Sequence, residues 1–233
     1  MLVLLPTNCI VCGRSSTNPN SLCHDCESEL PWMGRACSDC GIPIDTQSLK
    51  DDTCGSCLIA PPPFSSCRGI FHYDSPIDKL ISGFKFNAHF HVGFTLSTIL
   101  ANKMREHYTK TQNPDLLLAI PLHRNRLKQR GFNQSIEIAR VISRYCQIPL
   151  AKSVLSKIRD TSPQTELGSA RARKSNLKGA FRLANARQLE SVKSIALIDD
   201  VVTTMATVSA VSKVLQHHGI RRIDVWCLAR SSR

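Results

Sequence analysis

Eight of the eleven cysteines form four Cys-x-x-Cys pairs near the start of the chain. Two intervening residues let both thiolates of a pair face one metal ion, and two pairs complete the tetrahedron that zinc prefers. We therefore expect two zinc ions per chain, each bound by two consecutive pairs. The expected ligands are Cys9, Cys12, Cys23 and Cys26 for one ion, and Cys37, Cys40, Cys54 and Cys57 for the other.

Other chemistries of these cysteines are weaker alternatives. A thioredoxin-like redox motif occurs once, at a strand-to-helix turn, whereas this chain has four pairs. Disulfides are disfavoured in a reducing compartment. Four thiolates also suit iron, so the sequence leaves zinc and iron open. The module is expected to be a structural staple for a segment too small to fold on its own core, with docking of nucleic acid or protein as the alternative.

A second group of residues with chemical potential lies near the end of the chain. Asp199 and Asp200 follow the apolar run 195–198, and a hydroxyl-rich loop with Thr203, Thr204 and Thr207 comes next. Adjacent carboxylates at a strand end can accept hydrogen bonds from vicinal ribose hydroxyls. Amides at a helix start, aided by threonine hydroxyls, form an anion site. The plain alternative is an Asp-Asp turn before a threonine-capped helix.

Strands and helices that alternate must position these groups. Three consecutive prolines at 61–63 favour an extended spacer, and we place a domain boundary at residue 66. We predict a parallel, doubly wound sheet beyond it, with 1–66 as the metal module and 67–233 as an α/β domain. The predicted strands are 69–73, 116–120, 195–198 and 223–228, and the predicted helices are 76–84, 92–107, 134–145 and 206–217.

The net charge of +12 divides unevenly along the chain. Residues 1–67 hold seven acids and three bases, and the remainder holds eleven acids and twenty-seven bases, which gives −4 and +16. The densest basic stretch, 124–182, favours a polyanion such as a phosphorylated metabolite or nucleic acid, with a solvated surface as the alternative. The eight Phe, three Tyr and two Trp are scattered, without the aromatic stripe of strong single-strand binders.

Targeting signals are not evident in the 233 residues. The apolar run at 2–5 is shorter than the roughly 7 to 15 residues of a secretory signal, and no apolar stretch reaches the roughly 20 residues that cross a bilayer. A soluble, cytoplasmic protein with no membrane span is therefore expected.

Two sets of residues resemble a known family. The segment 195–207 resembles the motif with which type I phosphoribosyltransferases bind 5-phosphoribosyl 1-pyrophosphate (PRPP). Further stretches resemble one branch, the ComF/GntX family of competence-associated proteins. These are the four cysteine pairs, Phe84-Lys85-Phe86, Pro121-Leu122, Arg130-Gly131-Phe132-Asn133-Gln134, Thr161 with Gln164, 176–181 and Trp226-Cys227-Leu228-Ala229-Arg230.

The resemblance implies a type I phosphoribosyltransferase fold, magnesium, and a role for each site residue. Asp199 and Asp200 would hold the ribose, and Arg124 beside magnesium would offset charge on the leaving pyrophosphate. The 5′-phosphate would be held by Thr203, Thr204, Met205, Ala206 and Thr207, and the pyrophosphate by Pro121, Leu122, His123 and Arg124. The stretch 159–176 resembles a mobile hood.

One position departs from the family pattern, because Met205 stands where the family's phosphate loop has glycine. Glycine allows positive φ and close approach of the backbone. The implied function is a phosphoribosyltransferase or a PRPP-dependent sensor linked to DNA uptake. The alternative is an inactive protein that binds single-stranded nucleic acid through the same fold. Partners implied by the resemblance are PRPP, single-stranded DNA, and DNA-uptake or recombination proteins.

Overall fold

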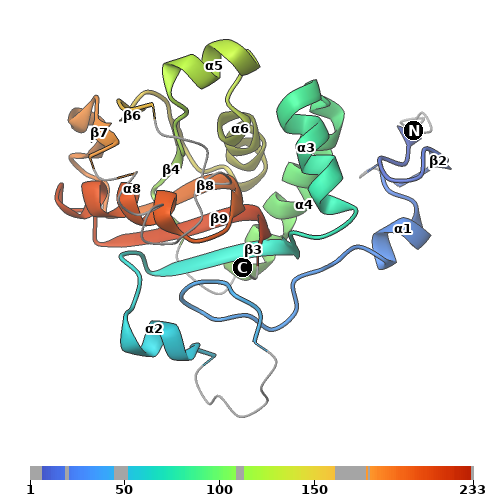
Figure 1. Cartoon of the computed structure of the whole chain (residues 1–233), viewed down its shortest axis with the longest axis horizontal. Coiled ribbons are helices and arrows are strands. Elements are labelled where there is room, and N and C mark those ends of the chain that lie inside the picture. Colours follow the sequence, from blue (N-terminus) through green and yellow to red (C-terminus); the bar gives the residue numbers. More distant parts are fainter. Residues whose placement is uncertain are drawn as a thin grey trace.

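A five-stranded, entirely parallel sheet forms the centre of the protein (Figure 1). The computed structural model describes residues 7–18, 21–44, 52–108, 113–160, 177 and 179–231. The central strands of the sheet carry runs of Ile, Leu and Val, which are typical of parallel strands buried on both faces. In spatial order the strands are β3 (Ser66–His72), β9 (Arg222–Arg230), β8 (Ser194–Val202), β4 (Leu116–Ala119) and β5 (Leu150–Ala151).

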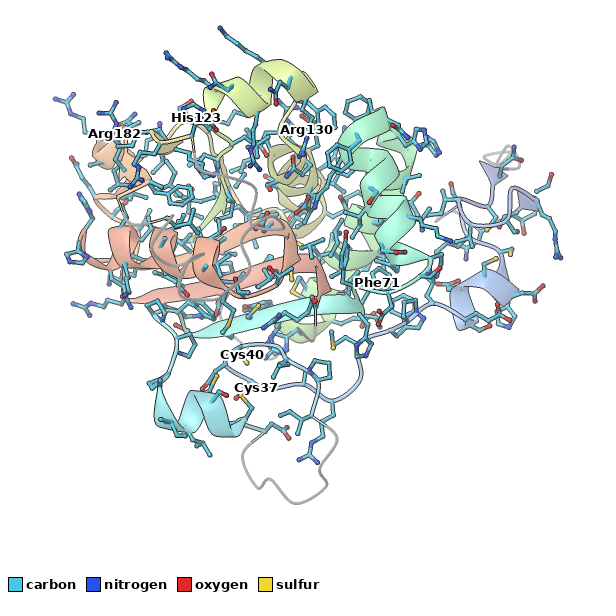
Figure 2. The ribbon with its side chains drawn as sticks, viewed as in Figure 1. Cys37, Cys40, Phe71, His123, Arg130 and Arg182 are labelled. Atoms are coloured by element: carbon cyan, nitrogen blue, oxygen red, sulfur yellow. The ribbon has the colours of Figure 1, made fainter. Side chains whose placement is uncertain are left out.

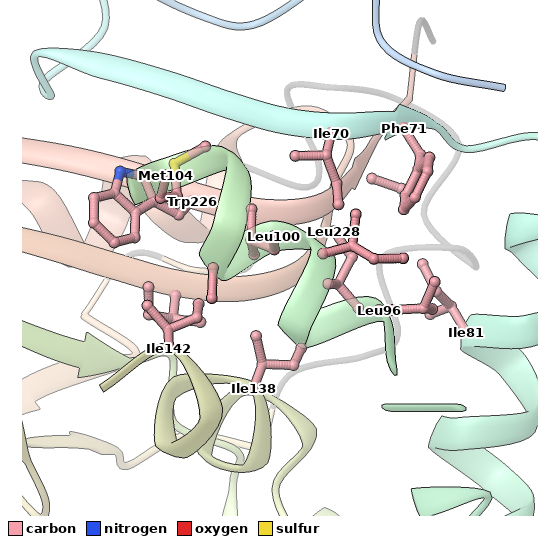
Figure 3. Close-up of a cluster of buried hydrophobic side chains, with 14 of the residues drawn as sticks. Ile70, Phe71, Ile81, Leu96, Leu100, Met104, Ile138, Ile142, Trp226 and Leu228 are labelled. Atoms are coloured by element: carbon pink, nitrogen blue, oxygen red, sulfur yellow. The ribbon is translucent and has the colours of Figure 1, made fainter. Parts of the chain in front are cut away.

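Helices cover both faces of this sheet. One face packs on α3 (Ile77–Asn87), α4 (Phe90–Tyr108) and α6 (Gln134–Cys146), and the other packs on α8 (Ala206–Gln216). The alternation of side chains along β8 divides its residues between the two cores: Ala196 and Ile198 face the first, and Ile195 and Leu197 the second. Figure 3 shows the first core, where Ile138 and Ile142 of α6 approach Leu100 and Trp226. The predicted α/β class, with a parallel sheet flanked by helices, is confirmed.

The order in which strands are added to the sheet changes direction between β4 and β8. The connection after β4 passes through α6 to β5, on one side of the pair, whereas the connection after β8 passes through α8 to β9, on the other side. Such a switch point, at the carboxyl ends of the two strands, is where open α/β sheets bind ligands. The register pairs Ala119 with Ile198, so the loop after β4 lies next to the acids of β8.

The remaining elements are short. The prediction missed α5, a seven-residue helix with no buried residue, because its sequence RNRLKQR has no apolar periodicity. It also missed the β6–β7 pair, whose strands have three residues each. These elements are β1 (Thr7–Asn8), β2 (Ser15–Ser16), α1 (His24–Ser28), α2 (Gly55–Ile59), α5 (Arg124–Arg130), β6 (Leu155–Lys157), β7 (Phe181–Leu183) and the 3-10 helix η2 (Ala186–Leu189).

The cysteine-rich segment packs directly on the sheet edge. Residues 31–33 run beside β3, where the amide of Met33 donates to the carbonyl of Ile70 at 2.8 Å, and the Trp32 and Phe71 ring centroids lie 4.7 Å apart. Leu22 and Leu30 enter the first core. In Figure 1, α1 lies at the right edge of the molecule, beyond α3, whereas α2 lies below β3. The boundary at residue 66 coincides with the start of β3, and stays a prediction as the limit of an independent domain.

Within the described ranges, none of the helices combines the length and the apolar character needed to cross a membrane.

Two glycines at equivalent positions test how the segment docks. Gly13 (φ +75) and Gly41 (φ +69) each follow the second cysteine of a pair, but a Cβ at Gly41 would lie 2.6 Å from the Cys67 carbonyl oxygen, and one at Gly13 would meet nothing within 4 Å. In both Gly→Ala variants the left-handed backbone conformation should lower the free energy of unfolding by about 1–2 kcal/mol. We expect Gly41→Ala to lose a further 1–3 kcal/mol, about the cost of overpacking, in urea unfolding of the metal-loaded protein. Equal losses would contradict close docking at Gly41.

Candidate functional site

The structure gathers the eight paired cysteines into two clusters, in the grouping expected from their order. The first cluster is Cys9, Cys12, Cys23 and Cys26, and the second is Cys37, Cys40, Cys54 and Cys57. Within each cluster all sulfurs lie within 4.8 Å of one another. The Cys12–Cys23 and Cys40–Cys54 sulfurs are both 3.7 Å apart. A zinc tetrahedron with Zn–S bonds of about 2.3 Å has edges of about 3.8 Å, so both clusters fit zinc.

Backbone hydrogen bonds repeat in the two clusters. The amides of Gly13 and Gly41 donate to the carbonyls of Cys9 and Cys37, each at 2.9 Å. Burial alone would raise the pKa of the Cys37 thiol, but hydrogen bonds from neighbouring backbone groups outweigh it and lower that pKa to about 7, and the same balance lowers the pKa of Cys9 to about 6. Burial instead raises the pKa of Cys40 to about 11. The spacing of the sulfurs, and not these pKa values, gives the chain two zinc-binding sites of four cysteines each.

The acid pair, Asp199 and Asp200, lies at the carboxyl end of β8, where the strand order changes direction between β4 and β8. Only 9% of Asp199 and 4% of Asp200 is exposed. The Asp199 Oδ1 atom accepts from the Ser135 hydroxyl at 3.1 Å and from the Asp200 amide at 3.0 Å. The Asp200 Oδ1 atom accepts from the Val201 amide at 2.7 Å, and its Oδ2 atom lies 2.8 Å from the Lys85 ammonium.

Burial dominates the electrostatics of the acid pair. Burial, and after it the neighbouring Asp200 charge, raise the pKa of Asp199 from an ordinary 3.8 to about 7, against the opposing effects of Lys85 and the hydrogen bonds. Two adjacent carboxyl groups in a low-dielectric site cannot both ionise without cost. The pair is therefore prepared for a ligand that brings hydrogen-bond donors or a cation.

Three basic side chains from separate elements interact electrostatically with the acid pair. Lys85, on α3, makes the direct contact with Asp200. Burial lowers the pKa of Arg130, at the end of α5, and the charge of Asp200 opposes that change. Burial and the charge of Arg126 lower the pKa of Lys157, on β6, and Asp160 and Asp199 oppose them. Sequence reasoning noticed the segments that contain Lys85 and Arg130 but assigned them no role, because their contacts with the acids are long-range.

The loop 203–207 follows the acid pair and opens α8. Met205 has φ 62 and ψ 1, the left-handed conformation that glycine adopts without strain. The Ser209 amide donates to the Met205 carbonyl at 2.8 Å, so the helix starts directly after this residue. The Thr204 hydroxyl oxygen is buried and has no hydrogen-bond partner among the described residues. A buried hydroxyl without a partner costs free energy, so its presence at a helix start favours a ligand there.

The loop after β4 starts beside the carboxyl end of β8 and carries the other expected residues. The Ile120 amide donates to the Ile198 carbonyl at 3.0 Å, and the Asn133 side-chain amide donates to the Ile120 carbonyl at 3.0 Å. Pro121 and Leu122 follow, and His123 caps α5 and lies 3.3 Å from Asp160. Arg124 is exposed at the first turn of α5. Figure 2 shows His123 and Arg130 at this end of the molecule. Of the expected hood, 161–176 lies outside the described residues.

Comparison with known proteins agrees with this architecture. The fold and the two clusters define an α/β protein with a double zinc module docked on its sheet, and a family model described as "Double zinc ribbon domain" matches residues 1–58. Competence protein F from Haemophilus influenzae is 33% identical over 228 residues, which is 96% of this chain and 96% of that protein. This chain belongs to the competence protein F family.

Further relatives span nearly the whole chain. DNA utilization protein YhgH from Escherichia coli K12 is 32% identical over 225 residues, or 96% of this chain and 90% of that protein. Competence protein ComFC from Streptococcus pneumoniae is 22% identical over 238 residues, or 95% of this chain and 99% of that protein.

A solved structure, a purine phosphoribosyltransferase from Pyrococcus horikoshii, aligns with 59% of this chain and 81% of its own, at 16% identity and a TM-score of 0.32.

The burial of Asp199 predicts a distinctive dependence of stability on pH. Its pKa of about 7 exceeds the ordinary 3.8, so its stabilising contribution is complete below pH 3.8 and is lost as the pH rises to 7. The free energy of unfolding of Asp199→Asn should therefore exceed that of the native protein by at least about 1.4 kcal/mol at pH 8, which is the equivalent of one pKa unit. The difference should be smaller at pH 4.5. Thermal unfolding at both pH values measures the gain.

Asp115→Asn is the control with the opposite sign. Hydrogen bonds from the backbone amides of Lys193 and Ser194 lower the pKa of Asp115, so its stabilising contribution is present at neutral pH and is lost as the pH falls through its folded-state pKa. The Asn variant should lose stability at pH 8. If Asp199→Asn also loses stability at pH 8, the ionised form of Asp199 is favoured by the fold and our interpretation is wrong.

Proposed function

We propose that this protein binds PRPP with magnesium at the carboxyl ends of β4 and β8. The observation that carries the proposal is the sequence of features at the end of β8: two buried adjacent carboxyl groups, an unpartnered buried Thr204 hydroxyl, and a left-handed Met205 at the start of α8. A ribose with vicinal hydroxyls and a 5′-phosphate matches both halves of this arrangement, because carboxylates accept from hydroxyls and a helix start attracts phosphate.

The roles of individual residues follow from their positions. Asp199 and Asp200 would accept from the ribose hydroxyls, and the loop 203–207 would hold the 5′-phosphate. The loop Pro121–Arg124 lies next to the acids through the pairing of Ala119 with Ile198, and would face the pyrophosphate. Magnesium, when bound, would offset the negative charge of that pyrophosphate.

Basic side chains would add positive charge to the site. Lys85 contacts Asp200, and the charges of Asp200 and Asp199 act on Arg130 and Lys157 respectively, so a polyphosphate ligand would bring its negative charge near three basic groups. Arg124 is exposed and would meet the pyrophosphate from the first turn of α5.

We further propose a role in DNA uptake or use. The support is the names of relatives that match nearly the whole chain, competence protein F and DNA utilization protein YhgH. A phosphoribosyl transfer would require an acceptor, and the described residues identify none.

Calorimetric titration of PRPP with and without magnesium tests the site. Asp200→Ala removes one charge-assisted acceptor, worth roughly 1.5–3 kcal/mol, so affinity should fall about tenfold or more. Asp115→Ala, at the amino-terminal edge of the sheet, is the matched control and should keep the native affinity. Absence of binding to the native protein at millimolar PRPP with magnesium would exclude the proposed ligand.

A second candidate function, binding of single-stranded DNA, is favoured by a surface that sequence reasoning did not find. Phe86, Phe90 and Phe94 are 73%, 50% and 52% exposed, although the sequence shows no aromatic stripe. They come from two consecutive helices, and the Phe90 ring centroid lies 4.8 Å from that of Phe132. The Arg130 guanidinium lies 5.1 Å from the centre of the Phe86 ring. Aromatic faces beside basic side chains are the usual platform for stacked bases.

Fluorescence anisotropy with a labelled oligothymidylate tests this surface. Phe86→Ala with Phe90→Ala removes two stacking faces, each worth roughly 1–3 kcal/mol, so affinity should fall at least tenfold. Leu58→Ala with Ile59→Ala is the control, because these side chains are 66% and 88% exposed but lie on α2. Binding should also weaken steeply with added salt. Equal affinity of both double variants would place any DNA site elsewhere.

A further inference from the structure

We propose that Arg230 and Met205 act as positioning residues that connect the second cluster to the loop 203–207. Zinc at the second cluster, and not at the first, then sets how well that loop binds the phosphate of its ligand. The inference rests on the proposed function for the identity of the ligand, but the connection itself is carried by contacts between described residues.

Arg230 bridges the two sites through its guanidinium. Its Nε atom donates to the carbonyl of Cys40, a residue of the second cluster, at 2.9 Å. Its Nη1 atom donates to the carbonyl of Val202 at 3.1 Å and to that of Thr203. One rigid, planar group therefore ties the backbone of a zinc ligand to the first residue of the loop.

The surroundings of Arg230 hold it in this position. Only 3% of the residue is exposed. A Cβ on Gly69 would lie 3.0 Å from the Cβ of Arg230, so the neighbouring strand leaves little room for another course of the side chain. The guanidinium donates to four backbone carbonyl oxygens, the last of them that of Ser231. A zinc ion with four thiolates carries about −2, and this charge stabilises a buried cation beside it.

Met205 makes the second connection. It is the central residue of the loop, and its side chain packs against the buried sulfurs of the second cluster and also against the core beneath α8. A non-glycine residue at φ 62 persists only where its surroundings hold it in place. The methionine that stands in place of the family's glycine therefore points toward the metal site, where its packing offsets the strain of the loop.

The first cluster has a different neighbourhood. Cys9 lies in the first core beside α3, with Leu22 and Leu30, whereas Met205 packs against the second core and the second cluster. Loss of zinc from the second cluster would instead remove the charge beside Arg230 and the packing surface of Met205 together. The loop should then lose the backbone geometry that presents the Thr204 hydroxyl and the amides of α8.

Two double variants separate the clusters. Cys54→Ser with Cys57→Ser empties the second, and Cys23→Ser with Cys26→Ser empties the first, with native mass spectrometry to count zinc. Hydrogen exchange of the amides in 201–208 should speed up at least tenfold only in the second-cluster variant, and its affinity for PRPP with magnesium should fall about tenfold. The first-cluster variant should keep both values within about threefold of the native protein.

Arg230→Lys tests the bridge with zinc in place. The variant should retain two zinc ions and show hydrogen exchange in 201–208 that is about tenfold faster. Arg222→Lys, at the other end of β9, should leave exchange in 201–208 unchanged. If Arg230→Lys does not fold, Met205→Gly serves instead, and exchange in 201–208 should again speed up while zinc is retained. Equal exchange and affinity in the two cluster variants would overturn the connection. Failure of the native protein to bind PRPP would refute the ligand alone, because the exchange contrast does not depend on it.

Discussion

The burial of two adjacent carboxyl groups is the constraint on which the site depends. Asp199 and Asp200 sit at the end of the central strand β8 with almost no access to water. A direct contact from Lys85, the Ser135 hydroxyl and two backbone amides partly offset the desolvation of the carboxylates, and the pKa of Asp199 is still near 7. Such a pair is costly as pure structure, which is why it marks a place for a ligand.

The parallel sheet determines where this pair can be used. The strand order changes direction between β4 and β8, and helices on opposite faces carry the loops after these two strands apart. The loop after β4, the acid pair and the start of α8 therefore meet, although Pro121 and Asp199 are 78 positions apart in the sequence. Lys85 of α3 comes to the same place and contacts Asp200.

The two zinc sites serve different parts of this frame. Each site lies in a segment too short to bury a core of its own. Four cysteines around one zinc ion, together with local backbone hydrogen bonds of the same type in both sites, hold the segment together. The first cluster extends the core next to α3, whereas the second contacts Arg230 at the end of β9 and, through Gly41, Cys67 at the start of β3. A duplicated sequence motif has therefore acquired two structural settings.

The sequence by itself determined the features that depend on neighbours along the chain. Cysteine spacing indicated two four-thiolate clusters, and the run 195–207 indicated a buried strand, an acid pair and a helix start, because these are local patterns. Only the tertiary structure decided the contact of Lys85 with Asp200, the bridge from Arg230 to Cys40, and the grouping of Phe86 with Phe90 and Arg130. Those contacts join residues from different elements, and their distances arise from strand order and helix packing, which no local pattern encodes.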